Sequence, residues 1–242
     1  MRYRNLLEEL DQYTEDRVVN LSGEIRIVGA ARDPIRFGGL FRTSTRSYLG
    51  PPARPEAIWE VGEHQLPALQ FYEDRPSPRF VCVGAMRSGK TEILVRAAGR
   101  LALSFRNADI GMVSPTSGKL AILWKKLARI LPPSWVDKAS LHAVLEPPFI
   151  RLVNGVRFQF LSAKAPSKQM GSPIHGQDWV AAFVDEEQQV LDEAISDIVM
   201  RGSDAPGGWY PILSTCTISD APEWRARLAR YRTDPAVTVY PM

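Results

Sequence analysis

The stretch G-A-M-R-S-G-K-T, residues 84 to 91, decides the fold of this 242-residue chain. It matches the phosphate-loop pattern G-x-x-x-x-G-K-[ST], and the apolar residues 80–83 before it predict a buried strand. Polyphosphates carry clustered negative charge, which backbone N–H groups and a helix N-terminus bind well. We therefore expect nucleotide contacts from all residues of this loop, namely Gly84, Ala85, Met86, Arg87, Ser88, Gly89, Lys90 and Thr91.

Three side chains of the loop have separate expected roles. Lys90 would neutralise the β and γ phosphates, and the Thr91 hydroxyl would bind Mg²⁺. Arg87 stands where such a loop often carries a small residue, and its guanidinium could stabilise charge on the γ-phosphate in the transition state. The alternative for Arg87 is a side chain that points into solvent.

Two carboxylates follow another apolar run, residues 180–184, which predicts a buried strand. Asp185 could orient the Mg²⁺ shell beside Thr91, and Glu186 could polarise a water molecule for in-line attack. Glu187 continues the acidic run and is expected to be solvated. The alternative is that these acids cap an exposed helix.

Composition is that of an ordinary globular protein, with 45% hydrophobic residues, 24% charged residues and a net charge of +3. This charge permits contact with nucleic acid without demanding it. Cys82 and Cys216 lie in apolar runs, so we expect buried thiols and an intracellular protein. No apolar stretch approaches the ~18 residues of a membrane span.

The order of predicted elements indicates an α/β fold with a mostly parallel central sheet flanked by helices. Residues 1–60 are expected to form an N-terminal helix and a basic irregular arm, which contacts nucleic acid or is simply solvated, and residues 61–242 the phosphate-loop domain. The expected elements are strands at 80–83, 110–113, 180–184 and 211–216, helices at 92–105 and 120–131, and a hairpin of 149–153 and 156–161.

In the order and spacing of its motifs, the chain resembles the ATPase domain of the large subunit of tailed-phage terminases, from about residue 66 to residue 224. The matching stretches are 67–70, similar to the adenine-reading glutamine motif with Gln70, then the loop at 84–91, and 113–116, 154–160, 168–171 and 184–186. The resemblance implies a P-loop NTPase of the ASCE type that hydrolyses ATP with Mg²⁺, with Glu186, Arg87 and Lys90 as catalytic residues.

The resemblance also implies partners and a cellular location. It implies a homo-oligomeric ring in the host cell cytoplasm that drives double-stranded DNA into procapsids with a portal protein and a small terminase subunit, and no membrane. Two other functions stay open: a DNA-stimulated helicase-like ATPase, and an assembly module that binds nucleotide without motor activity.

Some parts of the family pattern are matched more loosely. Ser214 and Thr215 stand at the position of the coupling motif, although Cys216-Thr217 replaces the usual Thr-Pro ending. An arginine that completes a neighbouring subunit's site could be Arg201, with Arg227 and Arg230 as other candidates. Family members normally continue into a nuclease domain; we expect neither that domain nor DNA cleavage from these residues.

Overall fold

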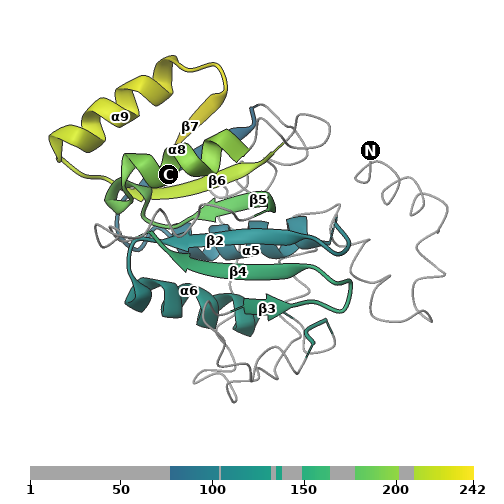
Figure 1. The fold of residues 1–242 in the computed structure, drawn as a ribbon. Coiled ribbons are helices and arrows are strands. Elements are labelled where there is room, and N and C mark those ends of the chain that lie inside the picture. The colour runs from purple at the N-terminus through teal and green to yellow at the C-terminus, as the bar shows by residue number, and fades with distance from the viewer. Residues whose placement is uncertain (1–76, 104, 132–134, 138–148, 164–177, 202–209) are drawn as a thin grey trace, which may run out of the picture.

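The computed structural model describes residues 77–103, 105–131, 135–137, 149–163, 178–201 and 210–242. The described residues form one seven-stranded sheet with helices on both faces (Figure 1). Three predictions lie outside the described residues: the arm at 1–60, the adenine contact of Gln70 and the motif at 168–171.

The strand order in the sheet is β3-β4-β2-β5-β6-β1-β7, and every pair is parallel except β3 with β4. The strands are β1 (Arg79–Gly84), β2 (Asp109–Ser114), β3 (Phe149–Arg151), β4 (Arg157–Ser162), β5 (Trp179–Val184), β6 (Ile212–Thr217) and β7 (Val237–Pro241). The helices are α5 (Lys90–Ala102), α6 (Ser117–Ile130), the short 3₁₀ turn η3 (Glu187–Gln189), α8 (Asp192–Arg201) and α9 (Pro222–Thr233).

The predicted α/β fold with a mostly parallel sheet is confirmed. The predicted hairpin is the antiparallel pair β3–β4, joined across Gly155, whose φ of 82° suits glycine. Thr116 caps α6 by accepting a hydrogen bond from the Lys119 backbone N–H at 3.3 Å. Helix α9 and strand β7 were not predicted from the sequence.

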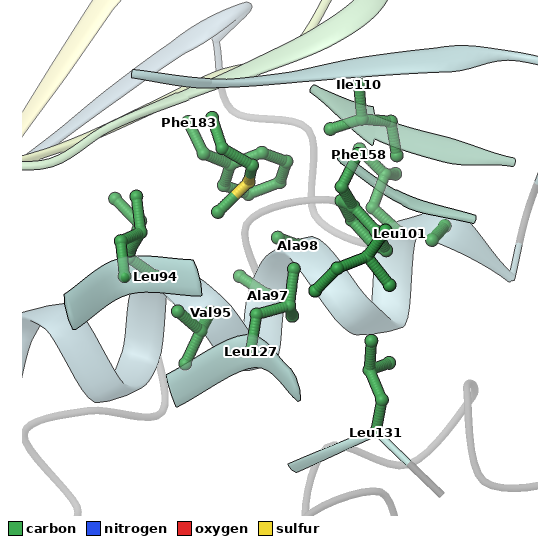
Figure 2. Packing of buried hydrophobic residues seen from close by; sticks show 14 of the residues in the cluster. Leu94, Val95, Ala97, Ala98, Leu101, Ile110, Leu127, Leu131, Phe158 and Phe183 are labelled. Atoms are coloured by element: carbon green, nitrogen blue, oxygen red, sulfur yellow. The ribbon is translucent and has the colours of Figure 1, made fainter. Parts of the chain in front are cut away.

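The core has two sides because successive strand residues point to opposite faces of the sheet. One face packs against α5 and α6, and Figure 2 shows Leu94, Ala98 and Leu127 of these helices near Phe158 and Phe183 of the sheet. The opposite face packs against α8 over the middle of the sheet and against α9 over β1 and β6. No described helix is long and apolar enough to span a membrane.

The topology brings the sequence motifs to one edge of the sheet. Strand β6 lies between β1, which leads into the phosphate loop, and β5, which leads into Asp185 and Glu186. Because these three strands are parallel, their carboxyl ends meet at the same edge, where ligands of open α/β sheets bind. The sheet therefore places the loop, the acids and the end of β6 side by side.

Candidate functional site

The phosphate loop runs from the last residue of β1 to the first turn of α5. Gly89 adopts a left-handed conformation at the N-cap, with φ of 86°, and so does Arg87, with φ of 66°. A side chain on Gly84 would meet the Met242 carbonyl oxygen at 2.9 Å, so only glycine fits there without a shift. The loop is thus a tightly folded backbone turn at a helix N-terminus, the arrangement that binds phosphate.

Lys90 is held at the centre of this loop. Its side chain is buried, and its ammonium donates hydrogen bonds to the Gly84 carbonyl at 3.0 Å and to the Ala85 carbonyl at 2.5 Å. Ala85, Met86 and Arg87 are exposed on the outer side of the loop. The ammonium therefore lies beneath the exposed outer residues of the loop and is bonded to the loop's own carbonyls.

Thr91 and Asp185 are brought into direct contact. The Thr91 hydroxyl donates to Asp185 Oδ1 at 3.1 Å, across 94 residues of sequence. The Asp185 backbone N–H donates to the Val113 carbonyl at 2.9 Å, which fixes the acid at the end of β5. A hydroxyl and a carboxylate oxygen are ligands that Mg²⁺ prefers.

Burial raises the pKa of Asp185 above its ordinary value. Hydrogen bonds from Thr215 and Thr91 lower the pKa and offset part of this effect, while the neighbouring charge of Glu186 raises it. A bound cation beside this carboxylate would favour the ionised form.

Glu186 has a strained backbone with φ of 55°, in the left-handed region. Non-glycine residues in this conformation cluster at functional sites. The Glu186 carboxylate accepts hydrogen bonds from the Thr217 hydroxyl at 2.9 Å and from the Gln188 side chain. The turn therefore projects Glu186 away from the strand direction and two polar neighbours orient it.

The end of β6 contacts both acids. Of the two residues that make these contacts, the sequence analysis named Thr215 and missed Thr217. The Thr215 hydroxyl donates to Asp185 Oδ1 at 2.7 Å, and Thr217 reaches Glu186. Ser214 is buried on the opposite face, and its hydroxyl has no hydrogen-bond partner among the described residues. Strand alternation, counted from Thr215, would have selected Thr217 rather than Ser214.

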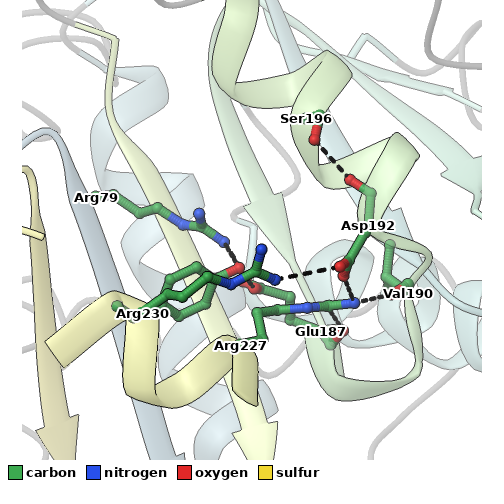
Figure 3. A network of polar contacts seen from close by, with 8 residues as sticks. Arg79, Glu187, Val190, Asp192, Ser196, Arg227 and Arg230 are labelled. Carbon is green, nitrogen blue, oxygen red and sulfur yellow. Dashed lines mark hydrogen bonds and ion pairs between the residues drawn. The ribbon is translucent and has the colours of Figure 1, made fainter. Parts of the chain in front are cut away.

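The expectation that Glu187 is solvated is wrong. Its side chain is fully buried, and its carboxylate accepts hydrogen bonds from Arg79 at 2.6 Å and from the Tyr231 hydroxyl at 2.7 Å. Figure 3 shows Arg79 and Glu187 in this network between the sheet and α9. Buried carboxylates need such partners, and here both partners come from distant parts of the chain.

The three candidate arginines for a neighbour's site differ in their surroundings. Arg227 is buried and donates to the Glu187 and Val190 carbonyls, each at 3.0 Å, so its side chain is engaged within its own chain. Arg230 is exposed and donates to Asp192 at 3.3 Å. Arg201 is the last residue of α8.

A dedicated protein cage for a metal is not found among the described residues, where no group of three or more His, Cys, Asp or Glu side chains converges. In general, Mg²⁺ takes only one or two protein ligands and completes its shell with phosphate oxygens and water. The two metal ligands expected from the sequence, Thr91 and Asp185, lie in contact, with their side-chain oxygens 3.1 Å apart.

No family model and no curated protein matches the sequence. Solved structures do match. The large terminase of a thermophilic bacteriophage aligns with a TM-score of 0.61 and 17% identity, over 76% of this chain and 46% of that chain. The HK97 bacteriophage large terminase aligns with a TM-score of 0.61 and 17% identity, over 87% of this chain and 43% of that chain.

The ATPase domain of the Thermus phage P74-26 large terminase aligns with a TM-score of 0.52 and 14% identity, over 76% of this chain and 81% of that domain. The terminase of the thermophilic bacteriophage has also been solved in complex with ADP and with ATP-γ-S. This chain thus spans less than half the length of that protein and of the HK97 protein. Its fold is that of the ATPase domain of phage large terminases.

Proposed function

We propose that this chain is the ATP-hydrolysing motor domain of a viral terminase large subunit. The observation that carries the proposal is the contact of Thr91 with Asp185, because it joins the phosphate loop and the acidic strand end in one site. Kinases and GTPases need the loop, but a glutamate directly after the strand acid is typical of hydrolytic phosphate-loop enzymes. The fold shared with large terminases supports the same choice.

The residues divide the chemistry of hydrolysis among themselves. The loop N–H groups and Lys90 bind the phosphates, and Glu186 accepts a proton as water attacks the γ-phosphorus. Arg87, exposed on the loop, stabilises charge on the γ-phosphate oxygens. Gln70 would contact the adenine, as the resemblance of residues 67–70 implies.

Thr91 and Asp185 would hold Mg²⁺, which when bound neutralises charge on the phosphate oxygens. Their oxygen donors and their separation of 3.1 Å fit a hard cation. Thr215 bonds the Asp185 oxygen that faces Thr91, so a cation bound there would act directly on the end of β6. That contact supports a coupling role for Thr215.

The motor function adds partners to this site. We infer a homo-oligomeric ring on double-stranded DNA that works with a portal protein and a small terminase subunit in the host cytoplasm. In that ring Arg201 is the candidate that completes a neighbour's site. Catalysis of DNA cleavage is assigned to none of these residues.

The variant Glu186→Gln tests the assignment of the base. It should keep ATP binding, measured by fluorescence of a labelled nucleotide, and lose phosphate release by roughly a hundredfold or more. A variant that binds ATP and turns it over at the parent rate would reject Glu186 as the base. Thr233→Ser, a matched mild change on the surface of α9, should leave both readouts unchanged.

A helicase-like ATPase would use the same hydrolytic site. Strand separation by the chain, without any response of its ATPase rate to procapsids or portal protein, would favour that function. Stimulation by portal-bearing procapsids and blunt duplex DNA, without strand separation, would favour the packaging motor.

A further inference from the structure

The turn that carries Glu186 is fixed on both sides. Before it, the Asp185 N–H is bonded to the Val113 carbonyl in β2. After it, Glu187 lies fully buried, with its backbone carbonyl bonded to Arg227 and its carboxylate bonded to Arg79 and Tyr231. Because Glu186 has φ of 55°, a conformation that persists only where the surroundings enforce it, these flanking contacts fix the backbone of the turn from which its side chain, oriented by Thr217 and Gln188, projects.

The carboxylate of Glu187 is bonded through only one of its two oxygens in the described part of the chain. Oε1 accepts both the Arg79 and the Tyr231 hydrogen bonds, and Oε2 is buried without a hydrogen-bond partner in the described part of the chain. The Tyr231 hydroxyl also accepts a hydrogen bond from Arg79 at 2.7 Å, so the three groups close a ring of contacts. The guanidinium of Arg79 lies over the Tyr231 ring, 4.1 Å from its centre.

The carboxylate of Glu187 raises the pKa of both groups that bond to it, Arg79 and Tyr231. Burial lowers the pKa of Arg79, but the Glu187 carboxylate and Tyr231 outweigh it, so the net pKa is raised. Burial and the charge of Glu187 raise the pKa of Tyr231 well above its ordinary value. Tyr231 therefore remains a hydroxyl donor, and the network joins the start of β1, the turn after β5 and helix α9 (Figure 3).

We propose that Glu187 is a positioning residue for hydrolysis: held by Arg79 and Tyr231, it aims Glu186 at the attacking water. The proposal rests on the proposed function, in which Glu186 is the base. Glu187 itself does not touch the nucleotide, because its carboxylate lies under α9 on the face of the sheet opposite α5. Through Tyr231, helix α9 thereby helps to orient Glu186, although the helix is distant in sequence from the phosphate loop and from the two acids.

The substitution Tyr231→Phe tests the proposal with the least disturbance. It keeps the ring beneath Arg79 and removes only the hydroxyl, which donates to Glu187 and accepts from Arg79. We expect kcat for ATP to fall roughly tenfold while KM stays within about twofold, because the aim of Glu186 changes and phosphate binding does not. Glu187→Gln should lower kcat further, by about a hundredfold.

Leu228→Ala is the matched control, because Leu228 packs on the same side of α9 and makes none of these hydrogen bonds. It should lower the melting temperature without lowering kcat. If Leu228→Ala and Tyr231→Phe lower kcat equally, the network only attaches α9 and the proposal is overturned. An unchanged kcat in Tyr231→Phe would overturn it as well.

Amide hydrogen exchange separates this proposal from the proposed function, because it needs no turnover. The N–H groups of Gln189 and Val190 are bonded within the turn, to the Glu186 and Glu187 carbonyls, each at 2.9 Å. Their exchange should accelerate roughly tenfold in Tyr231→Phe and stay unchanged in Leu228→Ala. A chain without ATPase activity would refute the proposed function alone, whereas unchanged exchange in Tyr231→Phe would refute the role of Glu187.

Discussion

Replacing Thr215 by valine should destabilise the protein in a pH-dependent way. Valine keeps the shape of the side chain and removes the hydroxyl that donates to Asp185 Oδ1 at 2.7 Å. Asp185 is only 6% exposed, so water does not replace the lost donor. A hydrogen bond to a charged group contributes about 1.5 to 3 kcal/mol, so we expect the free energy of unfolding to fall by about 2 kcal/mol near pH 7.

The cost should be smaller in acid. Burial already raises the pKa of Asp185, and loss of the Thr215 hydrogen bond raises it further. A carboxyl group with a raised pKa in the folded state contributes stability that is present below its unfolded pKa of about 3.9 and is lost as the pH rises through the folded value. Near pH 3, below the unfolded pKa of about 3.9, the bond joins largely neutral groups, and its loss should cost only about 1 kcal/mol.

Urea unfolding at the two pH values measures this difference. Ser214→Ala is the control, because that neighbouring hydroxyl is buried without a hydrogen-bond partner in the described residues, and its cost should not depend on pH. Equal costs of Thr215→Val at both pH values, or a cost under about 0.5 kcal/mol near pH 7, would refute the reasoning.

Three further predictions concern the loop, α9 and the thiols. Gly84→Ala should cost roughly 1 to 3 kcal/mol in thermal unfolding, since its Cβ would lie 2.9 Å from the Met242 carbonyl oxygen. Arg227→Ala should cost about 3 kcal/mol in urea unfolding, because this buried side chain bonds two carbonyls of the turn after the acids. Cys82 and Cys216 should resist alkylation near pH 8 until the chain unfolds, because burial raises the pKa of Cys82 to about 12 and that of Cys216 well above its ordinary value.

Each of these predictions has an outcome that contradicts it. Gly84→Ala at full stability would mean that the end of the chain after β7 does not pack on the loop. Arg225→Ala, a matched change at an exposed arginine of α9, should lower the free energy of unfolding by under about 0.5 kcal/mol. An equally small loss in Arg227→Ala would contradict the stabilising role of the buried Arg227 side chain. Rapid alkylation of the native protein would contradict the burial of both thiols.

Local patterns were sufficient to predict the central strands and the two motifs that meet at one edge of the sheet. The strands before the phosphate loop and before Asp185 are continuous apolar stretches, so their residue types alone predict that they are buried. Their meeting follows from the parallel sheet, since strands β1, β6 and β5 all end at the same edge. The contact of Thr91 with Asp185 is the result.

Long-range contacts account for what was missed. The burial of Glu187 depends on Arg79, 108 residues away, and on Tyr231, 44 residues away, so an acidic run read alone indicates a solvated surface. Helix α9 is rich in arginine and buries few apolar residues, and edge strand β7 is short and partly exposed. Neither shows the strong apolar periodicity from which elements are predicted.

Release of γ-phosphate at saturating ATP and Mg²⁺ is the measurement that tests the central claim most directly. The 242-residue chain should release phosphate, and Lys90→Ala should abolish the release, because the buried ammonium at the centre of the loop is removed. Absence of phosphate release from the parent chain, or equal release from Lys90→Ala, would contradict a hydrolytic site at this edge of the sheet.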